Sequence, residues 1–207
     1  MADEMKWVEW ARELQFLSQS ALAYCKDAYD IERFRRIREI SAEMVSQLTD
    51  TPIDKVKGLF ASEEGYQTPK LDTRAAVIRD GRILLVHEKD GRWALPGGWV
   101  DYDLTIRTNV AKEVLEEAGM TVRPLRVIAL IEHNRHNTPP SIHNICSAFV
   151  LCEYVSGQFI PNLETVGCGF FAPDEIPSPL AGNKTNAAQI EMCFRAAADP
   201  NWQVVFD

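Results

Sequence analysis

The sequence predicts an α/β fold: a mixed β-sheet between two layers of helices, preceded by a small all-helical domain. Two observations predict it. Apolar residues recur at helical intervals before residue 65, and the pattern then changes to short strand-like runs. A helix between those runs and another after them favour an α/β/α sandwich. We place the boundary so that residues 1–65 form the helical domain and residues 66–207 the second domain.

The first domain is predicted to be a helical hairpin plus a shorter helix. Helical spacing of apolar residues extends over 5–24 and again over 30–48, and Pro52 suits the first turn of a third helix. Three helices of this size bury only a thin core. We therefore expect them to pack against a second subunit, giving a homodimer, or to contact the main domain and its substrate.

A linker and then a β-hairpin follow. Residues 61–71 mix charge, Gly and Pro without periodicity, as a linker does. Strands are predicted over 75–79 and 83–87, because these runs flank Asp80-Gly81, a strong two-residue hairpin signal. Residues 93–95 then lead into a double-glycine loop.

The remaining chain is predicted to complete the sheet and add the last helix. Apolar runs over 125–132 and 142–155 read as strands, separated by a polar loop over 133–141. Later signals are assigned in order: a hairpin over 155–159, a closing strand at 170–171, a helical turn over 173–176 and a helix over 185–198.

The most informative stretch is the helix predicted over 105–118, with Gly119 as its left-handed cap. Glu113, Glu116 and Glu117 stand at i, i+3 and i+4, so their carboxylates share one face. Such like-charged pairs cost about 0.2–0.5 kcal/mol each, unless a divalent cation lies among them. A solvated acidic face would explain Glu116-Glu117 alone. Gly97-Gly98, which lets a backbone carbonyl approach the same place, favours a metal site instead.

This segment resembles the Nudix box, G-x5-E-x7-R-E-U-x-E-E-x-G-U, where U is aliphatic. Seven residues match its fixed positions: Gly98, Glu113, Val114, Glu116, Glu117, Gly119 and Met120. Two residues depart, because Leu104 replaces the first Glu and Lys112 replaces the Arg. Lys112 lacks the bidentate fork that could hold Glu113, and Asp101 or Asp103 is expected to partner it.

The resemblance implies a Nudix fold and hydrolysis of a nucleoside diphosphate linked to another group, with Mg²⁺ or Mn²⁺ as cofactor. The predicted metal ligands are Glu113, Glu116, Glu117, Glu164 and a carbonyl of Gly97 or Gly98. The predicted catalytic residues are Glu113, Glu117 and Glu164. Glu164 is chosen because family members often carry an acid about six residues before the last strand's first aromatic residue, here Phe170. The alternative acid, Glu175, is better explained by helix capping.

Four residues are candidate substrate contacts. Arg74 could reach the phosphates or pair with a surface acid, and Trp99 could stack on a base or pack under its loop. His133 and Arg135 lie in a loop that offers donors to phosphate or sugar. The histidines of this region match no transition-metal signature, so ordinary polar roles are expected for them.

Composition limits the classes of molecule that the protein is expected to bind. A net charge of −8 with no basic block argues against a nucleic-acid polymer and leaves a small-molecule nucleotide derivative. The five cysteines show no metal-binding spacing and are expected to be reduced. Neither a signal peptide nor a long apolar run is evident, so we expect a cytoplasmic protein that does not contact membrane.

The helical extension together with the box reading GGWxD…KEVxEEAG resembles a Nudix subgroup that includes CDP-choline and ADP-ribose pyrophosphatases. CDP-choline is the first expected substrate, giving CMP and phosphocholine, and ADP-ribose the second. A nucleotide sensor without activity, or an interaction protein using its helical hairpin, are alternatives of other classes.

Overall fold

The computed structural model describes residues 2–207, with side chains described from residue 6 onward. The chain divides into two compact units, residues 1–69 and 70–207, and each is described by itself. No helix among the described residues has both the length and the apolar character needed to cross a bilayer.

The first unit contains the three predicted helices, α1 (Ala2–Tyr24), α2 (Ala28–Thr49) and α3 (Ile53–Phe60). Pro52 is the N-cap of α3, one residue before the predicted position. Small and polar side chains fill the interface between α1 and α2: Ala11, Gln15, Ser18, Ser41 and Ala42 are fully buried. Large apolar side chains remain outside, with Trp7 48% and Leu17 52% exposed.

The second unit is built on a mixed seven-stranded sheet of order β3-β2-β1-β5-β4-β7, with β6 paired to β2. Its strands are β1 (Lys70–Arg79), β2 (Arg82–Glu88), β3 (Trp93–Ala94), β4 (Met120–Glu132), β5 (Ile145–Gly157), β6 (Thr165–Phe171) and β7 (Val205–Phe206). Strands β1 and β5 are parallel, whereas β4 and β5 are antiparallel.

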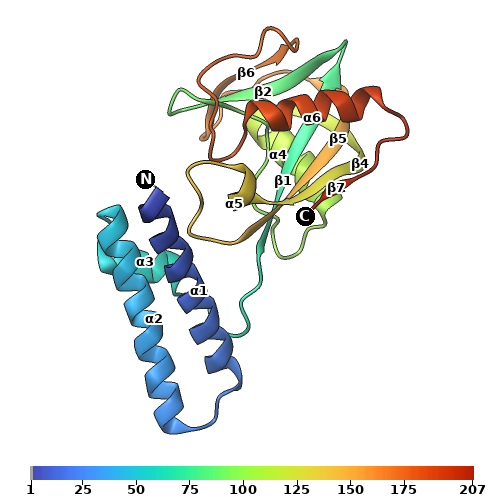
Figure 1. The fold of residues 1–207 in the computed structure, drawn as a ribbon. Coiled ribbons are helices and arrows are strands. Elements are labelled where there is room, and N and C mark those ends of the chain that lie inside the picture. Colours follow the sequence, from blue (N-terminus) through green and yellow to red (C-terminus); the bar gives the residue numbers. More distant parts are fainter. Residues whose placement is uncertain (1) are drawn as a thin grey trace. The chain divides into compact units, whose positions relative to one another are not determined.

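Helices cover both faces of this sheet, α4 (Ile106–Ala118) on one and α6 (Ala187–Ala198) on the other (Figure 1). Alternation along β1 divides the core, because Ala75 and Val77 pack toward α4 whereas Ala76 packs toward α6. Val110 and Val114 of α4 are fully buried. The predicted α/β/α sandwich is therefore confirmed.

Two predictions about local structure are wrong. The hairpin predicted over 155–159 is absent, because β5 continues to Gly157 and residues 158–164 form no strand. Gly157 instead pairs with the start of β4 at close range: its φ is 103°, and a Cβ there would lie 2.5 Å from the Gly119 carbonyl oxygen. The loop predicted over 133–141 contains a short helix, α5 (His133–His136), capped by Glu132.

Smaller differences concern the ends of elements. Helix α6 begins at Ala187, after the N-cap Asn186, two residues later than predicted. Thr185 is outside it because its hydroxyl accepts a hydrogen bond from the Leu95 N–H at 3.0 Å. The predicted helical turn over 173–176 is a simple hydrogen-bonded turn, and β7 was not predicted.

Candidate active site

Helix α4 positions the acidic residues of the site. Thr105 caps its N-terminus in a capping box, and Gly119 ends it with a left-handed φ of 68°. At the last turn, the Glu117 carbonyl oxygen accepts hydrogen bonds from the Thr165 hydroxyl at 2.6 Å and the Asn162 amide at 3.1 Å. The loop that carries Glu164 is thereby tied to the end of α4.

The double-glycine loop runs antiparallel to β1, close against its backbone. The Thr73 N–H donates to the Gly98 carbonyl oxygen at 2.9 Å. Gly97 has a φ of 148°, and a Cβ at this position would lie 1.9 Å from the Thr73 carbonyl oxygen. A Cβ at Gly98 would lie 2.7 Å from a carboxylate oxygen of Glu113. Close backbone approach therefore requires a glycine at Gly97, whereas a Cβ at Gly98 would displace the Glu113 carboxylate.

These elements surround a cavity of about 390 Å³ in the second unit. Five of the residues predicted as metal ligands line it: Gly97, Gly98, Glu113, Glu117 and Glu164. Three predicted substrate contacts also line it, namely Arg74, Trp99 and His133. Glu116 and Arg135 are not among its lining residues.

Two glutamates in the cavity are buried. Glu113 is 8% exposed and Glu117 is 7% exposed. Burial raises the pKa of Glu113, and it raises the pKa of Glu117 to about 7 despite the opposing hydrogen bond from the Gly97 N–H at 2.9 Å. A buried acid with a raised pKa is stabilised in its ionised form by a bound cation.

The third acid of the helix has a different environment. The Glu116 side chain is 57% exposed and lies 3.0 Å from the Lys112 ammonium. Lys112 also contacts Asp101 at 3.3 Å, as predicted from the sequence, and Glu113 at 3.4 Å. Lys112 therefore bridges three carboxylates at the edge of the cavity.

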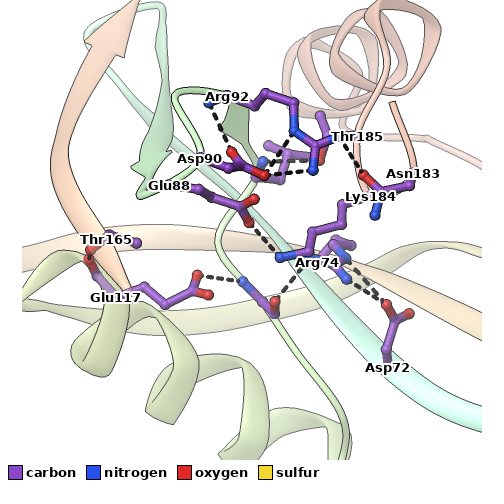
Figure 2. Close-up of polar contacts among 12 residues, drawn as sticks. Asp72, Arg74, Glu88, Asp90, Arg92, Glu117, Thr165, Asn183, Lys184 and Thr185 are labelled. Carbon is purple, nitrogen blue, oxygen red and sulfur yellow. Dashed lines mark hydrogen bonds and ion pairs between the residues drawn. The ribbon is translucent and has the colours of Figure 1, made fainter. Parts of the chain in front are cut away.

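Arg74 has a structural role in the site, because its side chain binds other groups of the protein. Its guanidinium donates to one carboxylate oxygen of Asp72 at 2.7 and 3.2 Å and to the Gly97 carbonyl oxygen at 2.9 Å (Figure 2). Its sequence-based alternatives were a phosphate or a surface acid, but its acidic partner is buried, with Asp72 3% exposed. Arg74 thus holds the glycine loop beside Glu117.

The other predicted residues lie as follows. Trp99 is 48% exposed and its ring meets that of His143 edge-on, with centroids 6.3 Å apart. His133 is 4% exposed, and burial lowers its pKa, which favours the neutral ring. Glu175, the alternative acid, pairs with Arg82 and is not among the cavity-lining residues.

Four polar residues that line the cavity were not predicted from the sequence: Asp72, Ser141, Asn183 and Lys184. Asp72 lies two residues before Arg74 in a strand, so strand periodicity could have placed them on one face. Asn183 and Lys184 gave no such signal. They come from a segment far along the chain that only the tertiary fold brings to the glycine loop.

A divalent cation fits the donor set. Hard cations prefer oxygen ligands, and the cavity offers two buried carboxylates whose ionised forms are destabilised without one. Within the described part of the chain, no three or more His, Cys, Asp or Glu side chains are gathered closely enough to hold a metal ion by themselves. An open site of few protein ligands, completed by water and substrate oxygens, is the arrangement typical of Mg²⁺.

Comparison with known families decides the classification. Residues 69–192, more than half of the chain, match the model of the NUDIX domain. The chain belongs to the Nudix family. Residues 5–60 match a second model, the UDP-X-like N-terminal oligomerisation domain, which covers the helical unit of this Nudix protein.

Individual relatives agree with this classification. A Bacillus subtilis protein named "Putative ADP-ribose pyrophosphatase YjhB" is 36% identical over 205 residues, which cover 99% of this chain and 98% of that protein. The crystal structure of a Streptococcus suis ADP-ribose pyrophosphatase is 45% identical, with a TM-score of 0.63, and covers 68% of this chain and 100% of that one. The crystal structure of a UDP-X diphosphatase is 27% identical, with a TM-score of 0.63, over 99% of both chains.

These relatives and the Nudix domain establish the protein as a Nudix pyrophosphohydrolase. The sequence-based alternatives of a sensor without activity and of a pure interaction protein are therefore not favoured. None of the three relatives described above is named for CDP-choline, so the comparisons do not support the first expected substrate.

Proposed function

We propose that this Nudix hydrolase cleaves, with Mg²⁺ or Mn²⁺, the pyrophosphate of a nucleoside diphosphate that carries a further group on its second phosphate. Water enters one side of the P–O–P bridge, and the products are a nucleoside monophosphate and the phosphorylated group. The observation that supports this most directly is the pair of buried carboxylates, Glu113 and Glu117, in one cavity.

Glu113 and Glu117 would hold the cation, with Glu164 as a further ligand or as the base that orients water. Glu116 remains a predicted ligand, and it would have to exchange its contact with Lys112. A cation bound there would polarise phosphoryl oxygens and acidify water. Arg74 keeps the glycine loop in place, so a carbonyl of Gly97 or Gly98 would complete the ligand set.

The substrate group is proposed at the level of its class. Trp99 offers a half-exposed aromatic face on which a base or sugar could stack. ADP-ribose and UDP-linked compounds come first, because relatives along most of the chain are named for them, and CDP-choline remains a sequence-based candidate.

A substrate panel tests this proposal. The full chain is incubated with Mg²⁺, then Mn²⁺, and with ADP-ribose, UDP-linked sugars, CDP-choline and dinucleoside polyphosphates, and products are separated by chromatography. Turnover of at least one compound that is abolished by EDTA is expected. Absence of turnover for every compound at high enzyme concentration would contradict the proposal.

We also propose that the helical unit makes the protein a homodimer. Trp7, Ile40, Met44 and Leu48 surround a hollow of about 300 Å³ on this unit. Sedimentation should give a dimeric mass, and Ile40→Asp should lower it to that of a monomer. Glu32→Gln, an exposed change on the same helix, is the control. A monomeric mass for the unmodified protein would refute the dimer.

A further inference from the structure

The segment before α6 is fixed against the sheet and the glycine loop. The Ala181 N–H donates to the Trp93 carbonyl oxygen at 2.8 Å. The Thr185 hydroxyl, which is buried, accepts from the Leu95 N–H at 3.0 Å. Lys184 lies between these two anchors, so its backbone is held in place before any ligand binds.

The side chains that line the cavity carry more negative than positive charge. Four acids and only two cationic side chains line it: Asp72, Glu113, Glu117 and Glu164 against Arg74 and Lys184. The proposed substrate adds a diphosphate, which is itself an anion. Metal ions bound by the acids would offset part of this charge, and a protein cation facing the phosphates would offset more.

Arg74 is already engaged. All three of its guanidinium nitrogens donate to groups of the protein, two to Asp72 and one to the Gly97 carbonyl oxygen. The residue is 6% exposed. Two of its five N–H donors remain, but moving the guanidinium toward a phosphate would break these bonds and leave Asp72 buried without its partner, at considerable cost.

Lys184 is in a different situation. Its ammonium group donates to a carboxylate oxygen of Glu88 at 2.5 Å, and its side chain is 39% exposed (Figure 2). An ammonium has three N–H donors, so one contact leaves donors for an anion. Glu88 is the more buried partner, since its side chain is 13% exposed. Glu88 therefore holds the ammonium at the wall of the cavity.

We propose that Lys184 binds the diphosphate of the substrate, with Glu88 as the residue that positions its ammonium group. This rests on the proposed function, because it assigns the phosphate-binding cation of the same site. The competing explanation is that the ion pair only anchors the segment before α6 to β2.

Two substitutions separate these explanations, because both remove the ion pair but only one removes the cation. Lys184→Gln should raise KM for the substrate identified on the panel about tenfold or more, the effect of losing a hydrogen bond to a charged group. Glu88→Gln, which still accepts from Lys184, should change KM by less than about threefold. Lys184→Arg should restore most of the binding, and Lys89→Gln, an exposed neighbour, is the control for charge alone.

Calorimetry with α,β-methylene-ADP and Mg²⁺ gives a readout that needs no turnover, because this diphosphate cannot be hydrolysed at its bridge. Lys184→Gln should weaken its binding about tenfold, and Glu88→Gln should not. Equal weakening by both variants, no weakening by Lys184→Gln, or no binding to the unmodified protein would overturn the proposal. Turnover with unaltered KM in Lys184→Gln would reject Lys184 and keep the proposed function. Binding that depends on Lys184, with no turnover of any substrate, would keep the assignment of Lys184 and reject the proposed function.

Discussion

Glu117→Gln should have opposite effects on activity and on metal-free stability. The substitution keeps the size of the side chain and can still accept the hydrogen bond from the Gly97 N–H. It removes the charge that we assign to the cation, so kcat should fall about 10²–10⁴-fold. Without metal, the same charge destabilises the folded state, because burial raises the pKa of Glu117.

The size of this destabilisation follows from the pKa of Glu117. An ordinary glutamate titrates near 4.5, whereas Glu117 titrates at about 7. A folded-state pKa above the unfolded one means that the folded protein binds the proton more tightly. Stability therefore falls as pH rises from about 4.5 to about 7, by about 3 kcal/mol in total. Metal-free Glu117→Gln should escape this loss and melt roughly 6–12 °C above the unmodified protein at pH 7.

Thermal unfolding in EDTA at pH 4.5 and pH 7 measures this difference. The gain from Glu117→Gln should be large at pH 7 and small at pH 4.5. Glu191→Gln, an exposed change on α6, should have little effect at either pH. A Glu117→Gln protein that is less stable than the unmodified one at pH 7, or a gain that does not depend on pH, would refute the reasoning.

Other changes test the surroundings of the acids. Gly97→Ala, which forces a Cβ against the backbone, should unfold the loop and lose activity at least 100-fold, whereas Gly167→Ala, with open space around it, should not. Glu164→Gln should lower kcat about 10–100-fold in steady-state assays, and Glu175→Gln, at an exposed ion pair, less than twofold. Arg74→Met should cost about 3–5 kcal/mol in urea unfolding, because it leaves a buried aspartate unpaired; a loss below 1 kcal/mol would contradict this.

Elements with strong local signals could be predicted from the sequence. The Gly119 cap of α4 and the Asp80-Gly81 turn are local features, and the structure agrees with both. The hairpin predicted around Gly157 is wrong because this glycine permits a close approach to the Gly119 backbone. The sequence does not show whether a glycine is needed for a turn or for such a close approach.

The site could be predicted most specifically where its residues share a local motif. Glu113 and Glu117 lie on one helical face, which the spacing specifies. The turning of Glu116 toward Lys112 depends on the local charge pattern at the edge of the cavity. Lys184 reaches the cavity through tertiary contacts alone, and no local pattern marks such a residue.

The most direct test of the central claim is crystallography of the full chain grown with Mn²⁺, read by anomalous scattering. We expect an anomalous peak in the cavity, coordinated by carboxylate oxygens of Glu113 and Glu117. Glu117→Gln should lose or weaken this peak under the same conditions. A well-ordered cavity in which these carboxylates bind no ion would contradict the account.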